Sequence, residues 1–220
     1  MPHRKSPFVA AIAAAALLGL SSMAQAAPAT WTIDPNHSNV TFTIRHFFSK
    51  VTGSFTKFSG KIVYDPANLS ASSAQAEIDA ASIFTANEKR DGHLKSADFF
   101  DVEKFPKLTF QSTKVTPKGD KLIIEGNLTM HGVTKPVTLE GAMLGSGPDK
   151  AGFEASGKLD RKEYGIIWNR VADQGGAMLG DDVTIQIAVE ANSEAAEAKR
   201  AEMMKKAAAE KGAGKAEAAK

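Results

Sequence analysis

The body of the chain, from Thr30 to Ala191, alternates apolar and polar side chains with a period of two. Over residues 39–46 one phase is polar, and the other consists of Val40, Phe42, Ile44 and His46. A period of two places alternate side chains on opposite faces of a strand, so this run predicts an antiparallel strand with one buried and one solvated face. The same alternation recurs at residues 74–79, 122–130, 137–139, 153–159 and 183–189.

Turn-forming residues separate these runs and divide the body into about eight strands. Residues 49–64 read either as one bent strand or as two, with Gly53 and Gly60 as bulges. The alternation stops most clearly between residues 82 and 103, where residues 87–100 predict a loop and a short helix.

A single open sheet of these strands would leave an apolar face uncovered, because the body offers no amphipathic helix to pack on it. Closing the sheet into a barrel hides that face and removes the sheet edges, so we predict an all-β antiparallel barrel. A two-sheet sandwich is the structural alternative. A barrel of this size holds either its own side chains or one small ligand. Small residues on inward phases, such as Ala76 and Gly157, indicate a cavity, although a tightly filled core of alternating sizes fits the same pattern.

The N-terminus has the three parts of a secretory signal peptide. Basic residues at positions 3–5 precede an apolar run from Phe8 to Leu20, and Ala24-Gln25-Ala26 supplies small residues where a signal peptidase cleaves. The apolar run is too short to span a bilayer core of about 30 Å. We therefore expect residues 1–26 to be removed on export and the mature chain not to span a membrane, with an uncleaved anchor as the alternative.

The chain contains no cysteine, although export leads to an oxidising compartment in which disulfides form. Disulfide-stapled folds, thiolate metal sites and cysteine nucleophiles are therefore excluded, and stability has to come from an ordinary hydrophobic core. The net charge is +2, and the sequence has no basic stripe with interleaved aromatic residues, so we do not expect nucleic acid as a partner.

The C-terminal segment consists almost entirely of Ala, Glu, Lys and Gly. This composition favours a solvated helix, because Met203 and Met204 are its only large apolar residues. Gly212 and Gly214 are expected to break that helix near its end, and a partner-binding arm is the alternative role. The predicted domain organisation is a signal peptide at 1–26, a barrel at 27–191 and a helical or disordered tail at 192–220.

Five blocks follow one another along the body: TWTIDPNHSNVTFTIRH, GSFTKFSGKI, RDGHLKSADFFDVEKFPKLTF, GNLTMHGVTKPVTL and LDRKEYGIIWN. In this order they resemble the YceI-like family, and the likeness extends from Trp31 to Glu190. The resemblance implies a lipocalin-like barrel in a periplasmic protein that binds a polyisoprenoid lipid or another long amphiphile. The tail lies outside the resemblance and is not assigned by it.

From the resemblance we expect an exported protein that sequesters or carries a long-chain isoprenoid, such as a polyprenyl phosphate or a quinone, or a similar lipid. No enzymatic activity, cofactor or metal is expected. The strand edges do not decide between a monomer and a loose homodimer. The residues predicted to line or contact the ligand are Phe42, Ile44, His46, Phe55, Phe58, Ile78, Arg90, Phe99, Phe100, Phe110, Leu128 and Phe153.

Polar residues near the predicted pocket each have a structural and a functional interpretation. His46 is expected either to form a hydrogen bond with a neighbour or to contact the ligand head group, and a metal ligand is a third possibility. Arg90 and Asp91 are expected to form a structural network in which Asp91 caps the short helix. The alternative is that Arg90 contacts a phosphate or carbonyl head. Arg161 is expected to pair with an acid such as Asp160, and the alternative is that it faces the ligand head.

The sequence is also compatible with two other functions. The first is an enzyme that acts on an apolar substrate with His46 and either Arg90 or Asp91, and it predicts pH-dependent turnover that is lost in His46→Ala. The second is a stress-related structural or partner-binding module with a filled barrel. That module would yield no extractable lipid, and its function would disappear when the tail from Asn192 is deleted.

Overall fold

The computed structural model describes residues 28–170 and 178–217, with side chains described up to Lys206. The predicted signal peptide, residues 1–26, lies outside the described residues.

Eleven strands within the described residues form one antiparallel sheet. The first six are halves of bent strands: β1 (Ala29–Ile33) with β2 (Asn39–His46), β3 (Ser49–Phe55) with β4 (Phe58–Tyr64), and β5 (Ser73–Asp79) with β6 (Ile83–Phe84). The others are β7 (Lys107–Lys118), β8 (Lys121–Met130), β9 (Val133–Ser146), β10 (Lys150–Asp160) and β11 (Leu179–Ser193). Counting each bent strand once gives the eight strands that the alternation predicts.

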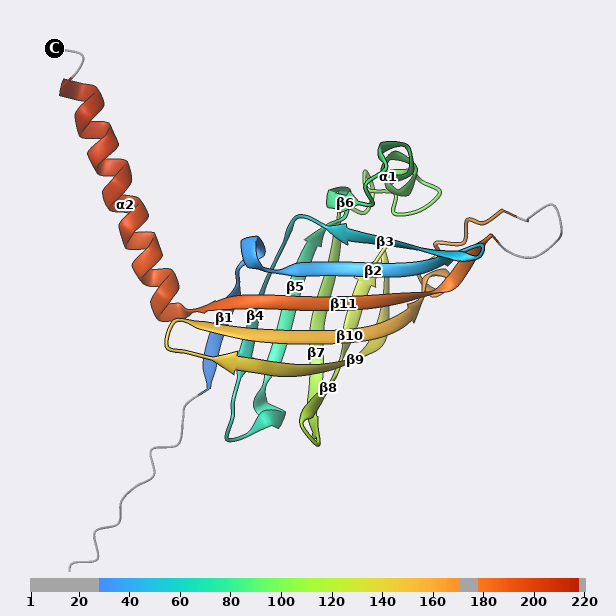
Figure 1. The fold of residues 1–220 in the computed structure, drawn as a ribbon, viewed down its shortest axis with the longest axis horizontal. Coiled ribbons are helices and arrows are strands. Elements are labelled where there is room, and N and C mark those ends of the chain that lie inside the picture. The colour runs from blue at the N-terminus through green and yellow to red at the C-terminus, as the bar shows by residue number, and fades with distance from the viewer. Residues whose placement is uncertain (1–27, 171–177, 218–220) are drawn as a thin grey trace, which may run out of the picture.

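The sheet closes on itself because β11 pairs with both halves of the first bent strand. Trp31 of β1 lies opposite Ser193, and Phe42 of β2 lies opposite Ile185. Figure 1 shows β2, β10 and β11 crossing in front of β5, β7 and β8. The fold is therefore a closed, eight-stranded antiparallel barrel, as predicted, and not the alternative sandwich.

The bend between β3 and β4 lies at Thr56-Lys57 and not at the glycines. Gly53 and Gly60 both sit in ladders of regular register, so the predicted bulges are wrong. A Cβ atom at Gly53 would come within 2.5 Å of the Phe42 ring. This glycine is needed because the ring of its cross-strand partner occupies the space that a side chain would take.

Buried side chains form two clusters toward different ends of the barrel. One lies beneath α1 (Glu88–Lys95) and contains Phe55, Ala80, Ile83, Phe99, Leu108, Leu128, Met130, Tyr164 and Ile166. The other lies near the start of α2 (Glu194–Glu217) and contains Trp31, Ala151, Phe153, Val189 and Ala191.

The break in the alternation contains α1, so the predicted loop with a short helix at residues 87–100 is confirmed. The helix is capped by Asn87, whose side-chain oxygen accepts the N–H of Arg90 at 3.0 Å. Asp91 lies inside the helix and points elsewhere, so its predicted role as the cap is wrong.

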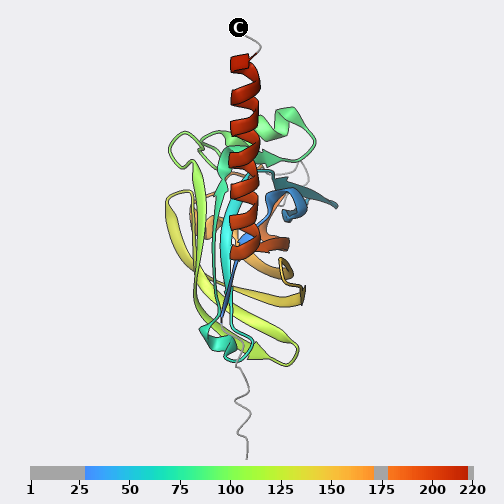
Figure 2. The same ribbon diagram turned by 90° about the vertical axis from the view of Figure 1, so that its left-hand side faces the viewer.

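The C-terminal helix α2 follows β11 directly and extends away from the barrel (Figures 1 and 2). It continues through Gly212 and Gly214 to Glu217, so the predicted break at these glycines is wrong. A glycine costs a helix about 1 kcal/mol relative to alanine, and the Ala, Glu and Lys residues around the two glycines favour helix. None of the described helices combines the length and the apolar character needed to cross a membrane.

Candidate functional site

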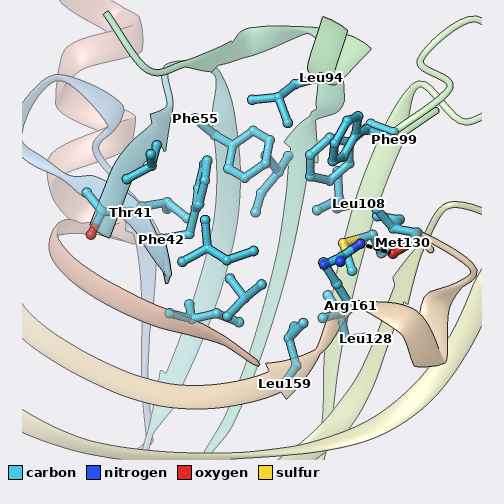
Figure 3. A pocket seen from close by; sticks show the side chains of 18 of the residues that line it. Thr41, Phe42, Phe55, Leu94, Phe99, Leu108, Leu128, Met130, Leu159 and Arg161 are labelled. Atoms are coloured by element: carbon cyan, nitrogen blue, oxygen red, sulfur yellow. Dashed lines mark hydrogen bonds between the residues drawn. The ribbon is translucent and has the colours of Figure 1, made fainter. Parts of the chain in front are cut away.

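The barrel encloses a cavity of about 680 Å³, which lies within the common range for small-molecule sites. Its wall is almost entirely apolar, and Figure 3 shows side chains from several strands and from α1 converging on it. Strands β2 and β11 supply alternate residues of the wall, namely Val40, Phe42, Ile44, Val183, Ile185, Ile187 and Val189. The period-two phases of these strands therefore point inward as the sequence predicts.

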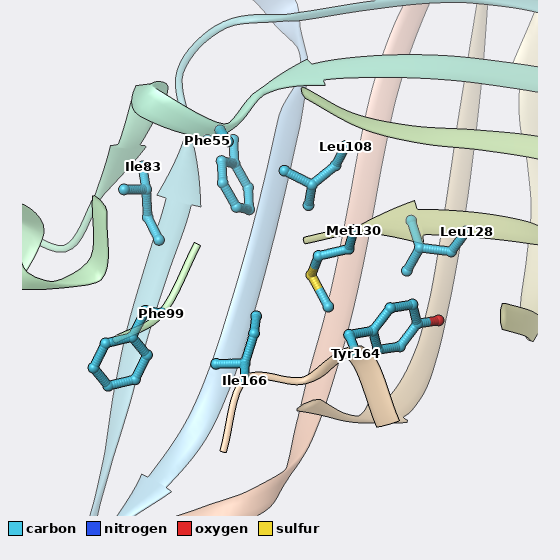
Figure 4. Close-up of a cluster of buried hydrophobic side chains, with 9 residues drawn as sticks. Phe55, Ile83, Phe99, Leu108, Leu128, Met130, Tyr164 and Ile166 are labelled. Carbon is cyan, nitrogen blue, oxygen red and sulfur yellow. The ribbon is translucent and has the colours of Figure 1, made fainter. Parts of the chain in front are cut away.

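All but one of the residues predicted to contact the ligand lie on this wall. They are Phe42, Ile44, His46, Phe55, Phe58, Ile78, Arg90, Phe99, Phe100, Phe110 and Leu128. Several of them, such as Phe55, Phe99 and Leu128, also belong to the cluster beneath α1 that Figure 4 shows. Contact between these residues and a ligand stays a prediction.

Phe153 lies away from the cavity wall, in the cluster near α2. Its ring centroid is 6.5 Å from that of Trp31 and 6.1 Å from that of Tyr64, and the residue is only 8% exposed. The inward phase predicted for Phe153 is correct, since Leu159 on the same phase of β10 does line the cavity. The prediction fails because three aromatic rings fill the barrel at that position along its length.

The helix α1 covers one end of the cavity. The ring centroid of His93 lies 4.9 Å from that of Trp168 and 5.0 Å from that of Phe99, and all three residues line the wall. His93 Nε2 also lies 2.8 Å from a carboxylate oxygen of Asp98. The aromatic contacts join α1 to the segment after β10, so the helix acts as a lid.

Arg90 and Asp91 form the predicted network through Thr85. Arg90 donates from Nε to the Thr85 hydroxyl and from Nη2 to the Thr85 carbonyl, each at 2.7 Å. Asp91 is buried and accepts the N–H of Thr85 at 2.9 Å and also its hydroxyl. Since Arg90 and Asp91 of α1 both form hydrogen bonds with Thr85, the network fixes the lid to the end of β6.

Arg161 is a wall residue that pairs with an acid, as predicted, although the acid is Asp181, 3.5 Å from its Nη2, and not Asp160. It is 3% exposed and donates to the carbonyl oxygens of Gly180 at 2.9 Å, Ile166 at 2.6 Å and Trp168 at 2.9 Å. Asp160, the predicted partner, instead caps the 3-10 helix η4 (Arg161–Tyr164). Burial lowers the pKa of Arg161, and nearby aspartates act in the opposite direction. The guanidinium therefore ties the segment after β10 to the start of β11.

Three further wall residues, Lys89, His93 and Trp168, were also missed as site residues. They lie in or near irregular segments, where no periodic pattern reveals which way a side chain points. The inward residues of β11 could have been predicted as site residues, because their alternation is as clear as that of β2.

His46 is half-buried on the cavity wall, and its ring stacks edge-on against Phe47 with centroids 5.3 Å apart. Its ring nitrogens form no hydrogen bond with another described residue, so the expected bond to a neighbour is not found. The predicted contact of His46 with a ligand head group stays a prediction.

A separate polar cluster lies outside the cavity, where His37 Nδ1 is 2.9 Å from Asp34 and 3.7 Å from Glu190. Their potential metal-ligand atoms lie within 4.8 Å of one another. However, Asp34 already accepts the N–H of Asn36 at 3.0 Å, and Glu190 forms an ion pair with Lys150. These contacts explain the cluster without a metal, because they join the 3-10 helix η1 (Pro35–His37) to β11.

Comparison with known proteins identifies the family of the chain. The model of the YceI-like domain matches residues 31–191. Protein YceI of Salmonella arizonae is 43% identical over 158 residues, which cover 69% of this chain and 83% of that protein. The crystal structure of Burkholderia cenocepacia BcnA is similar with a TM-score of 0.66 and 26% identity, covering 72% of this chain and 98% of that one.

A polyisoprenoid binding domain from Saccharophagus degradans is similar with a TM-score of 0.57, covering 76% of this chain and 99% of that one. At 14% identity this likeness shows the fold alone. The barrel, its cavity and the match over residues 31–191 agree: the chain belongs to the YceI-like domain family.

Proposed function

We propose that this protein is an exported, periplasmic binding protein that holds a long-chain isoprenoid or a similar amphiphilic lipid inside its barrel. The observation that carries the proposal is the apolar cavity of about 680 Å³ inside the barrel. Apart from Thr41, the polar residues of the wall lie in α1 and its N-cap, at the end of β2, and in η4 and the segment after it. An apolar chamber with polar groups at one end matches a ligand with a long tail and a small head.

The energetics of burial support such a ligand. Each buried CH₂ group contributes about 0.8 kcal/mol, so a chain of several isoprene units gains more than about 10 kcal/mol. Association and ordering cost about 4–15 kcal/mol, which leaves a useful affinity for the longer chains. Binding of this kind requires no catalytic group.

The cavity wall also favours binding over catalysis. Among the described wall residues there is no serine and no carboxylate to serve as a nucleophile or as a second acid–base group. The name of the Saccharophagus domain agrees with an isoprenoid ligand for the shared fold. Export is proposed from the N-terminal signal-peptide pattern.

Native mass spectrometry of the mature protein, purified from its own cells and followed by organic extraction, tests the proposal. We expect one lipid per chain and an N-terminus at Ala27. Ala76→Trp fills the cavity from β5 and is expected to abolish lipid retention, whereas Gln75→Trp, at the exposed neighbouring position, is expected to retain it. A wild-type protein that carries no lipid and accepts none after incubation with isoprenoids would refute the proposal.

A further inference from the structure

The hairpin between β2 and β3 carries two phenylalanines at its tip, Phe47 and Phe48. Phe48 is fully exposed, and its ring stacks on that of Phe47 with centroids 6.3 Å apart. Phe47 in turn contacts the ring of His46, which lines the cavity. A row of aromatic rings therefore extends from the cavity wall to the outside of the barrel.

A second large apolar side chain is exposed at the same end of the barrel. Ile167 is 70% exposed, and the next residue, Trp168, lines the cavity. Arg161 holds this segment against the start of β11 through carbonyl groups of both. The N–H of Phe47 donates to the carbonyl of Met178, just before β11, at 2.8 Å. The start of β11 thus joins the hairpin tip to the segment that contains Ile167 (Figure 1).

Basic residues flank both apolar sites. The hairpin tip reads RHFFSK over residues 45–50, and the second segment reads IWNR over residues 167–170, with no acid in either. Arg45, Lys50 and Arg170 are exposed. Exposed apolar side chains among basic ones are typical of surfaces that enter the interface of an anionic bilayer.

The acidic residues at the start of β11 offset this charge only in part. The hydrogen bond from Lys162 lowers the pKa of Asp181, and Arg45 contributes to the same effect. Asp182 pairs with a lysine of β10 at 3.4 Å. Lys50 forms no ion pair with a described residue, so its charge is available to a partner.

The charge also argues against a second copy of the chain as the partner. A two-fold contact through the same patch would bring the basic residues of both copies together, because each copy presents the same surface. Like charges that meet in an interface oppose association. An anionic lipid surface, in contrast, is attracted by each lysine or arginine close to it.

We propose that the hairpin tip (residues 45–50) and residues 167–170 form a docking surface for an anionic bilayer, into which Phe48 and Ile167 insert. Docking of this kind does not depend on the cargo, whereas its use in moving lipid between bilayer and cavity rests on the proposed function. His46 and Trp168 of the cavity wall adjoin the inserted residues, so a lipid would enter or leave the cavity close to the bilayer surface.

Flotation of the full-length mature protein with phosphatidylglycerol vesicles tests this docking surface, with phosphatidylcholine vesicles as the zwitterionic comparison. We expect the protein to bind phosphatidylglycerol more than about tenfold tighter than phosphatidylcholine, because several basic residues lie at the surface. Raising the salt concentration is expected to weaken the binding, since these residues are exposed.

Phe48→Gln and Ile167→Gln are each expected to weaken binding to phosphatidylglycerol about tenfold, because each removes a large apolar side chain from the bilayer. Lys50→Gln is expected to weaken it about fivefold. Two matched controls are expected to bind like the wild type. Leu144→Gln removes an exposed apolar side chain near the β9–β10 hairpin, and Lys61→Gln removes an exposed lysine of β4.

None of these five residues lines the cavity, so every variant is expected to keep its bound lipid. Full binding by both Phe48→Gln and Ile167→Gln would overturn the assignment of the docking surface. A wild-type protein that floats with neither kind of vesicle would overturn docking itself, and a dimer that Phe48→Gln dissociates would then assign the patch to a second copy. A protein that binds vesicles normally but carries no lipid would support docking and refute the proposed function.

Discussion

The ring of Tyr164 is 1% exposed and packs with Leu128 and Met130 in the cluster beneath α1 (Figure 4). Burial raises the pKa of its phenol to about 12, and the hydroxyl has no partner among the described residues. Tyr164→Phe keeps the ring and removes an unpaired polar atom, so we expect the free energy of unfolding to stay constant or to rise by up to about 1 kcal/mol. Urea denaturation measures this change.

Tyr164→Ala is the companion substitution, because it removes the ring as well. A loss of about 3–5 kcal/mol is expected from the cavity it creates. A loss of more than about 1 kcal/mol in Tyr164→Phe would instead show that the hydroxyl makes a stabilising bond.

The carboxylate of Asp34 makes the stability of the fold depend on pH. The hydrogen bond from His37 holds the pKa of Asp34 below its ordinary value of 3.8. A group with a depressed pKa stabilises the fold above the pKa of the unfolded chain, and this contribution disappears as the pH falls through the lower folded pKa. We expect Asp34→Asn to reduce the free energy of unfolding by about 1–2 kcal/mol at pH 7. The gap between wild type and variant should then narrow below about pH 4.

Urea unfolding of both proteins between pH 7 and pH 3 measures that gap. Glu103→Gln serves as the control, because Glu103 is exposed and forms no ion pair with a described residue. A gap that stays constant across the range would show that Asp34 stabilises the fold by a contact that does not depend on its charge.

Individual site residues could be predicted where a strand period applies and not elsewhere. Phe42, Ile44 and Leu128 follow from their phase, because alternate residues of a strand share one face. The partners of Arg161 could be predicted only in part, since besides Asp181 they are carbonyl groups of residues 166, 168 and 180, which only the folded loop brings together. Phase also gives no position along the barrel axis, which is why Phe153 was placed in the cavity.

At the scale of elements, two glycines are expected to respond in opposite ways to alanine. Gly132 joins β8 to β9 with a φ of +75°, and a Cβ atom there would come within 2.5 Å of the Phe105 ring. Gly92 lies in α1, and apart from its chain neighbours and the backbone of its own helix no atom lies within 4 Å of the position of its Cβ. We expect Gly132→Ala to destabilise the barrel by more than about 1 kcal/mol, through strain and overlap. Gly92→Ala should stabilise α1 by about 0.5–1 kcal/mol.

Hydrogen exchange of the α1 amides, together with urea denaturation of each variant, separates the local effect from the global one. In Gly92→Ala we expect slower hydrogen exchange of the α1 amides without a comparable change in the β8–β9 hairpin. If Gly132→Ala proved neutral, the turn would be able to shift Phe105 at little cost.

The elements themselves were largely predictable, because most of them depend on local alternation and turn residues. The bends that divide the first three long strands into β1 with β2, β3 with β4 and β5 with β6 were less predictable. They arise from pairing with two different sets of neighbours, as β11 does with β1 and β2. Bulges at Gly53 and Gly60 were predicted from residue type alone, whereas the glycines are required by close neighbours across the sheet.

At the scale of the whole molecule, stability and ligand space are divided along the barrel. The cluster around Trp31 and Phe153 fills the end near α2, while the basic residues and the lid lie at the other end. A ligand tail can therefore extend only until it meets the aromatic rings of the filled end, which sets a limit on the length of tail that the cavity encloses.

Among the residues whose side chains the structure describes, the tail helix α2 contacts the barrel near its first turns. Asn192 donates to Glu197, the N–H of Ala196 donates to Ser193, and Lys199 pairs with Asp149. Residues 201–206, which come next, are exposed. A chain that ends at Arg200 keeps all of these contacts, so we expect its melting temperature and lipid content to equal those of the full chain. This result would contradict the alternative in which the tail carries the function, whereas loss of bound lipid on truncation would support a role for α2 in loading or retaining the ligand.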